Sequence, residues 1–160
     1  MMTPTIYDTL DALGIRLGDP VRPAAAFVPW TVAGDLLFVS GHIARKDGRP
    51  WTGRLGGDLS TADGAAAARA TAIDLLATLH AATGDLTAIR RIVKLTVLVN
   101  SAPAFTEQHL VANGASELLV EVFGAAGAHA RSAFGAAQIP FGSCVEIELI
   151  AQLSPGRDAA

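Results

Sequence analysis

The spacing of hydrophobic positions along this chain changes several times between the period of a helix and that of a strand. Over residues 5–13 apolar side chains recur every three or four positions, which predicts a short N-terminal helix. The motif Ser60-Thr61-Ala62-Asp63 has the spacing of a capping box and predicts a second helix, which runs to about residue 82. Gly84 is placed to cap its C-terminal end. The Ala-rich first half of this helix favours close packing against a sheet.

Other segments have the pattern of strands, loops and a third helix. Strands are predicted over residues 24–32, 36–40 and 91–99, and two more between residues 129 and 151. The continuous apolar character of residues 36–40 predicts burial on both faces. The third helix is predicted over residues 104–110 and 114–123, with an interruption near Asn113-Gly114, and residues 44–58 as a long surface loop.

The resulting order is β-β-α-β-α-β-β with an extra N-terminal helix. Such an order predicts an α+β fold in which one mixed β-sheet packs on two main helices. We expect a single domain over residues 1–153, of which residues 1–20 form a helical extension, and a flexible tail over residues 154–160.

The segment His129–Ala151 carries the most chemistry. It is predicted to form two strands joined by the turn Ile139-Pro140-Phe141-Gly142. The first strand contains Arg131, and the second contains Glu146 and Glu148, whose spacing of two places both carboxylates on one face. If the two strands pair, Arg131 lies near the depth of Glu148. A guanidinium beside a carboxylate can hold a small anion and position a water molecule.

Composition narrows the function classes. The chain has 160 residues, a hydrophobic fraction of 51% and a net charge of −3, which describe a globular protein without the basic surface that nucleic acids require. No signal sequence and no run of about 20 apolar residues is evident, so we expect a cytoplasmic protein outside the membrane.

The single Cys144 excludes an intrachain disulfide and is expected in the core, and the four histidines lack metal-ligand spacing. We therefore expect neither a metal nor a cofactor.

Three separated segments together resemble a known family. They are the Arg-Ser-Ala and Val-Glu-Ile-Glu sequences of the His129–Ala151 segment, the strand Leu37–Ile43 with its Ser-Gly step, and Asn113–Glu117. In this order and spacing they are similar to the YjgF/RidA family, also called endoribonuclease L-PSP, over roughly residues 24–153. The long loop and the N-terminal helix indicate a longer subgroup of about 150 residues, with a more closed cleft and a different substrate.

The resemblance implies a chorismate mutase-like fold and a homotrimer whose sheets form a central barrel with clefts between subunits. It implies that Arg131 binds the carboxylate of a 2-imino acid. Glu146 follows fifteen residues later, the interval at which the family has a glutamate that positions the attacking water. For Glu148 the resemblance assigns no role, and a solvated strand face or a pairing across a subunit boundary is the simpler interpretation.

Further substrate contacts are implied at Gly41, through its peptide group, and at Ala133, where many relatives have cysteine. Trp30 stands where many relatives have a tyrosine that touches substrate, and its N–H offers a donor instead. His42 replaces the usual glutamine and lies beside the cleft or has a structural role. Asn113 matches a family asparagine near the site or caps a turn before Gly114.

The resemblance therefore implies an enzyme that hydrolyses 2-imino or enamine acids to 2-oxo acids and ammonia. The expected partner is thus a small 2-imino or 2-oxo acid. The alternative is a non-catalytic, regulatory trimer that binds a small molecule in the same intersubunit cleft, which the changes at Trp30 and His42 allow. An endoribonuclease is the third candidate, and the acidic pI near 5.7 argues against it.

Overall fold

The computed structural model describes residues 4–156, and its elements follow the predicted order. The helices are α1 (Ile6–Ala12), α2 (Thr61–Thr83) and α3 (Gln108–Phe123), with the short 3-10 helices η1 (Leu86–Ala88), η2 (Gly124–Gly127) and η3 (Pro140–Gly142). The strands are β1 (Trp30–Ala33), β2 (Leu36–Ile43), β3 (Arg45–Lys46), β4 (Arg49–Pro50), β5 (Ile89–Asn100), β6 (Ala130–Ala136) and β7 (Val145–Leu153). Residues 1–3 and 157–160 lie outside the described part, and with them most of the predicted tail.

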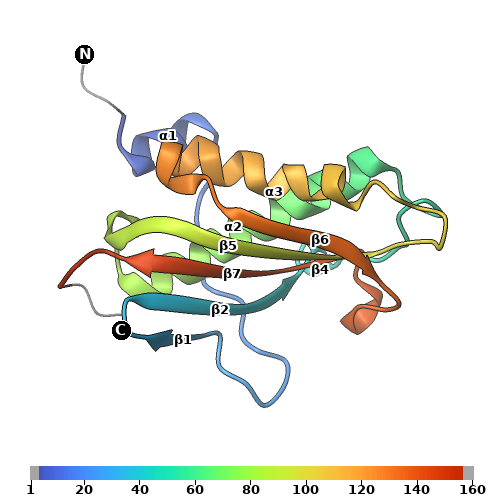
Figure 1. Ribbon diagram of the computed structural model, residues 1–160, viewed down its shortest axis with the longest axis horizontal. Coiled ribbons are helices and arrows are strands. Elements are labelled where there is room, and N and C mark those ends of the chain that lie inside the picture. Colours follow the sequence, from blue (N-terminus) through green and yellow to red (C-terminus); the bar gives the residue numbers. More distant parts are fainter. Residues whose placement is uncertain (1–3, 157–160) are drawn as a thin grey trace.

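The main sheet has the strand order β1-β2-β7-β5-β6 (Figure 1). The β5–β6 pair is parallel and the other neighbours are antiparallel, so the sheet is mixed. Helices α2 and α3 pack on one face, and no helix among residues 4–156 covers the opposite face, which we call the open face. The predicted α+β architecture on two main helices is confirmed.

Local sequence signals set the helix ends. Ser60 and Asp63 form the predicted capping box of α2, and Gly84 ends the helix with a φ of 71°, in the left-handed region that glycine adopts without strain. Thr5 and Asp8 form a second capping box at the start of α1. Each such cap stabilises a helix by about 1 kcal/mol.

Helix α3 is continuous, so the predicted interruption at Asn113-Gly114 is wrong, as is the interpretation of Asn113 as a turn or cap residue. Gly114 has a packing role instead. A Cβ atom at this position would lie 1.9 Å from the backbone oxygen of Ala65 in α2. Glycine therefore allows α3 and α2 to pack with their backbones nearly in contact.

The predicted hairpin between the last two strands is also wrong. Strand β5 lies between them, parallel to β6 on one side and antiparallel to β7 on the other. Helix α3 provides the crossover from β5 to β6 that a parallel pair requires. The turn at η3 then carries the chain across the end of β5 rather than back along β6.

Three smaller predictions need correction. The strand predicted over residues 24–32 begins only at Trp30, and the residues before it form no strand. Strand β2 is not buried on both faces, because Phe38 is 36% exposed on the open face. The loop over residues 44–58 contains the small β3–β4 ribbon and inserts Leu55 into the core, where it is fully buried.

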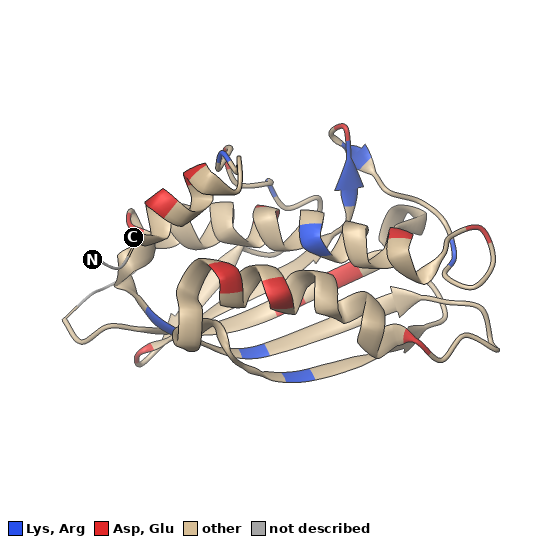
Figure 2. Ribbon diagram, turned by 90° about the horizontal axis from the view of Figure 1, so that it is seen from above, with Lys and Arg blue, Asp and Glu red and all other residues tan. Residues whose placement is uncertain are grey.

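Charged positions are scattered along the chain rather than gathered in one basic stripe (Figure 2). None of the helices in residues 4–156 has the length and apolar character needed to cross a membrane. Cys144 is fully buried in the core as predicted, and burial raises the pKa of its thiol to about 11.

Candidate functional site

Arg131 lies on the edge strand β6, and its guanidinium is fixed against α3. Nη1 donates to Asn113 Oδ1 and to Ser116 Oγ, both at 3.0 Å, and Nη2 donates to the backbone oxygen of His109, also at 3.0 Å. All three acceptors are neutral, and no carboxylate of residues 4–156 forms an ion pair with Arg131. The guanidinium is thus held in one orientation while its charge and its Nε–H remain available for an anion.

His129 and Ser116 extend this network, which we call the Arg131 cluster. His129 Nδ1 donates to the carbonyl oxygen of Gly127 at 2.6 Å, so the neutral ring accepts at Nε2 from the Ser116 hydroxyl at 2.9 Å. The Ser116 oxygen keeps its lone pairs for Arg131. Burial, reinforced by the charge of Arg131, lowers the pKa of His129 and favours this neutral form.

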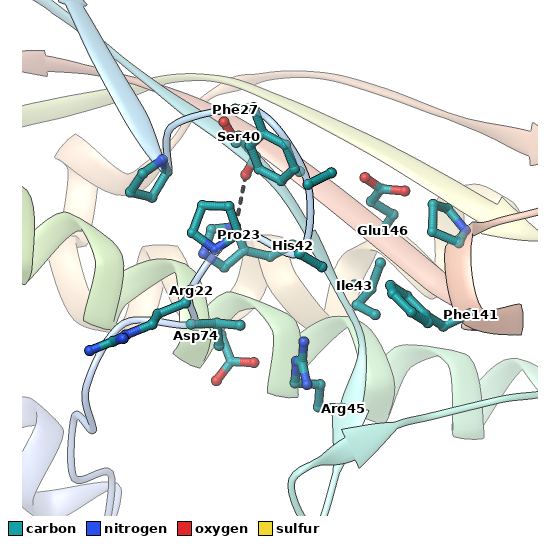
Figure 3. A pocket seen from close by; sticks show the side chains of 16 residues that line it. Arg22, Pro23, Phe27, Ser40, His42, Ile43, Arg45, Asp74, Phe141 and Glu146 are labelled. Carbon is teal, nitrogen blue, oxygen red and sulfur yellow. Dashed lines mark hydrogen bonds between the residues drawn. The ribbon is translucent and has the colours of Figure 1, made fainter.

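Glu146 lies on β7 between buried neighbours, so its side chain points away from the core to the open face. It lines a cavity of about 340 Å³ together with the Ser40-Gly41 step of β2 (Figure 3). Burial, with a smaller contribution from Glu148, raises the pKa of Glu146. No hydrogen bond or ion pair links its carboxylate to residues 4–156, so a half-buried acid faces the cavity without a protein partner.

Gly41 is required by the position of this carboxylate. A Cβ atom at Gly41 would lie 2.2 Å from Glu146 Oε1, so a larger residue would displace the acid. The backbone of Gly41 and the carboxylate of Glu146 therefore form one wall of the cavity.

The side chain of His42 has a structural role. Its Nδ1 donates to the Ser40 carbonyl oxygen at 2.7 Å, and Nε2 contacts Thr78 Oγ1 at 2.8 Å. The ring is 8% exposed, and burial lowers its pKa. With both nitrogens engaged, His42 ties β2 to α2 below the cavity and presents no free hydrogen-bonding group to a ligand.

Arg131 and Glu146 do not meet within one chain. Arg131 is opposite Leu95 on the helix-facing side, whereas Glu146 points to the open face two strands away. Strands lie about 4.8 Å apart, so the two backbones are separated by about 10 Å before the opposite directions of the side chains are counted. A single small substrate cannot contact both side chains of the same copy.

The remaining predicted substrate contacts, Ala133 and Trp30, do not line the Glu146 cavity. Ala133 lies on β6 beside the Arg131 cluster, on an edge whose outer backbone groups have no strand partner among residues 4–156. Trp30 packs against the core on the same side of the sheet as its buried partner Val39, and it does not line the Glu146 cavity. The exposed Glu148 lines a second hollow of about 230 Å³ on the open face. Residues 4–156 contain no group of three His, Cys, Asp or Glu side chains arranged to hold a metal.

The sequence interpretation missed three contributors. Ser116, a single serine inside a helix, becomes informative only when β6 is placed beside α3. Phe27 and Phe141 flank the cavity although they lie 114 positions apart (141 − 27). The one available signal was the Phe-Gly pair in the turn, where a small polar residue before the glycine is usual.

The chain is similar to a known protein family and to a curated protein. The profile of a family described as "YjgF/chorismate_mutase-like, putative endoribonuclease" matches residues 8–153. "Protein TCP17" from Trypanosoma cruzi is 47% identical over 147 residues, covering 91% of this chain and 92% of that protein.

Two crystal structures share nearly the whole fold. The protein Atu1372 of unknown function from Agrobacterium tumefaciens is 43% identical with a TM-score of 0.86, covering 93% of this chain and 92% of that one. A Shewanella oneidensis protein described as an endoribonuclease is 30% identical with a TM-score of 0.90, covering 94% and 100%. The E. coli yjgF gene product, at 25% identity over 94% and 98% of the two chains, has a TM-score of only 0.59.

Proposed function

The chain belongs to the YjgF/chorismate mutase-like family, and we propose that it hydrolyses 2-imino acids to 2-oxo acids and ammonia. The observation that carries this proposal is the presence of two groups of opposite charge that have no ion-pair partner among residues 4–156. Arg131 is anchored only by neutral acceptors, and Glu146 is a half-buried acid without a protein partner. A 2-imino acid supplies a carboxylate for the first and an electrophilic carbon near the second.

The reaction needs little beyond orientation, because a protonated imine carbon is already electrophilic. In our proposal Arg131 binds the substrate carboxylate, and Glu146 accepts a proton from water as its oxygen bonds to C2. The neutral carboxyl of Glu146 then returns that proton to nitrogen. As the C–N bond breaks, the hydroxyl on C2 gives its proton to the Glu146 carboxylate, which passes it to the departing ammonia. One protonated imine and one water thus yield one 2-oxo acid and one ammonium ion. The raised pKa of Glu146 suits these transfers.

We further propose that two copies share each site within a homotrimer. Arg131 lies on the edge strand at one side of the sheet and faces α3, and Glu146 points to the open face, so they can serve one substrate only from different copies. The unpaired edge of β6 and the open face, with exposed Phe38 and Phe134, are available for such an assembly. A trimer would have a mass of about 49 kDa, three times 16.4 kDa.

The test is complementation between two inactive chains. A 2-imino acid is generated in situ by an L-amino acid oxidase with semicarbazide as trap, and the fall in semicarbazone reports hydrolysis. Arg131→Ala and Glu146→Gln are each expected to be inactive. Co-expressed in equal amounts, they should regain about a quarter of wild-type activity, because about one site in four then combines both intact residues. No recovery refutes the shared site, and an inactive wild type refutes the deaminase.

The second candidate is a regulatory trimer that binds a 2-oxo acid without turnover. It is favoured by the places of Trp30, outside the Glu146 cavity, and of His42, whose ring nitrogens are both engaged. Thermal stabilisation by a 2-oxo acid, lost in Arg131→Ala, without hydrolysis of any imine would support this binder. An RNA digestion in the same preparation tests the activity named for the Shewanella relative.

A further inference from the structure

The Glu146 cavity is larger and more apolar than the proposed chemistry needs. One wall is formed by Glu146 and Gly41, and most of the remaining lining is apolar, with the charged side chains of Arg22, Arg45 and Asp74 also at the cavity (Figure 3). The apolar side chains include those of Val21, Pro23, Phe27, Pro29, Ile43 and Phe141. A three-carbon imino acid has six heavy atoms, and even at about 30 Å³ each they would occupy only about 180 Å³. The cavity measures about 340 Å³, so such a substrate would leave nearly half of it empty.

Phe141 is held at the cavity in a conformation that does not suit phenylalanine. In the turn from Pro140 to Ser143 both central residues have positive φ, 59° at Phe141 and 68° at Gly142. Turns of this type favour Asn-Gly, because asparagine tolerates the left-handed region far better than an aromatic residue does. The side chain is also 66% exposed. Neither the turn nor the core explains this residue, which points to a role for the ring at the cavity.

Phe27 reaches the same cavity from the N-terminal segment. It is 50% exposed and belongs to the stretch before β1 that forms neither helix nor strand. Two exposed aromatic rings from distant parts of the chain therefore flank the cavity that the Glu146 carboxylate lines (Figure 3). Their apolar surface would be removed from water by an apolar ligand between them.

We propose that this cavity receives the substrate's side chain, so that the enzyme selects 2-imino acids with branched or aromatic side chains. This inference rests on the proposed deaminase function. The carboxylate is bound by Arg131 of a neighbouring copy, the imine carbon lies at Glu146, and the side chain extends between Phe27 and Phe141.

The experiment compares imines generated from L-leucine, L-phenylalanine and L-alanine. For the wild type we expect kcat/KM at least tenfold higher with the two bulky imines than with the alanine-derived one. Phe27→Ala should reduce this preference to about threefold or less, because the bulky side chains lose an apolar contact. Val120→Ala, which shortens an exposed apolar side chain of α3 away from the cavity, is the matched control and should retain the full preference.

Phe141→Asn gives a second, sharper test, because it installs the residue that the turn prefers. We expect the melting temperature to rise by roughly 2–4 °C while the preference for bulky imines falls. A purely structural Phe141 would show a loss of stability together with an unchanged preference, and that result overturns the proposal.

Binding separates this inference from the deaminase itself. Calorimetry with 4-methyl-2-oxopentanoate and pyruvate should show at least tenfold tighter binding of the branched acid, even if no imine is turned over. Equal affinity and equal kcat/KM for small and bulky ligands would refute the apolar subsite while leaving the deaminase intact. A changed mass in gel filtration for Phe27→Ala, without a changed preference, would instead make these rings part of a subunit interface.

Discussion

The Arg131 cluster and the Glu146 cavity prepare their charged groups by opposite means. The cluster is polar, and three neutral acceptors from α3 fix the guanidinium in place. The cavity is mostly apolar, and it leaves the carboxylate without a protein partner and with a raised pKa. One region orients a group whose charge never changes, and the other adjusts the basicity of a group that must gain and lose a proton.

This difference explains how each region should respond to substitution. In the cluster a lost hydrogen bond changes where the guanidinium lies, so substrate binding should suffer. In the cavity a small shift of the carboxylate or of its surroundings changes proton transfer, so turnover should suffer.

Removal of the guanidinium should have the largest effect. Arg131→Ala is expected to reduce kcat/KM by about 10²–10⁴-fold, because a charge-assisted hydrogen bond contributes about 1.5–3 kcal/mol and two are lost. Arg131→Lys should recover only part of this loss, since lysine keeps the charge but not the planar fork. Steady-state kinetics with trapped imine measure both, and Arg91→Ala, at an exposed arginine of β5, should match the wild type. Wild-type kinetics in Arg131→Ala would remove the cluster from the site.

A methyl group on Gly41 should disturb the acid without disturbing the fold. Its Cβ would lie 2.2 Å from Glu146 Oε1, the flexible end of a side chain that can move aside. We expect kcat to fall about 10–100-fold with little change in melting temperature. Gly114→Ala is the contrasting variant, because its Cβ meets the backbone of Ala65 and should cost about 1–3 kcal/mol of stability. If Gly41→Ala lowers stability as much as Gly114→Ala does, its role is in packing.

Loss of the hydroxyl that holds Arg131 should raise KM more than it lowers kcat. Ser116→Ala removes an acceptor from the guanidinium and the donor to His129, and we expect about a tenfold rise in KM. Ser116→Thr, which keeps the hydroxyl, should restore most of the affinity. Ser132→Ala alters the next residue of β6, whose hydroxyl bonds Lys94, and serves as control. A fall in kcat alone would assign Ser116 to the chemical step.

Neutralising Glu146 should stabilise the fold slightly, and this is the smallest effect of the four substitutions. Because burial raises the pKa of Glu146 above its unfolded value near 4.3, its ionisation opposes folding as the pH rises through the folded-state pKa. Glu146→Gln should thus raise the melting temperature at pH 7–8, by up to about 4 °C, and show no such gain near pH 4. The exposed Glu148→Gln should show a smaller gain. A stabilisation independent of pH would mean that ionisation is not its cause.

Much of the fold was accessible from sequence because local chemistry determines it. The capping box at Ser60, the glycine at position 84 and the strand pattern of residues 91–99 each act within a few residues, and the structure has the helix ends and the strand as predicted. The order of the strands depends instead on contacts between segments that lie far apart in the sequence. A turn such as Ile139-Pro140-Phe141-Gly142 between two strand patterns is compatible with a hairpin, and nothing within residues 129–151 reveals that β5 inserts between them.

The candidate site likewise has features that the local sequence indicates and features that depend on distant segments. Arg131 and Glu146 were identified through the family resemblance of their sequence motifs, but their placement on opposite faces depends on the distant β5. Asn113 was placed near the arginine by resemblance, and only the continuous α3 shows the hydrogen bond between them. The ring at position 141 is a conflict between side chain and backbone, and such conflicts become visible only with the φ angle.

The stretch ahead of β1 supplies one side of the cavity, yet it contributes no strand to the sheet and no helix to the layer behind it. It is tied to the sheet at Ser40 of β2, whose N–H donates to the Pro29 carbonyl oxygen at 3.0 Å and whose hydroxyl donates to the Val28 carbonyl oxygen at 2.7 Å. Irregular segments tolerate insertion and exchange far better than the scaffold that bears them. Descendants of a common ancestor could therefore diverge in what they consume by rewriting these few residues, and an engineer could exchange the same stretch between relatives to change selectivity without touching the reactive acid.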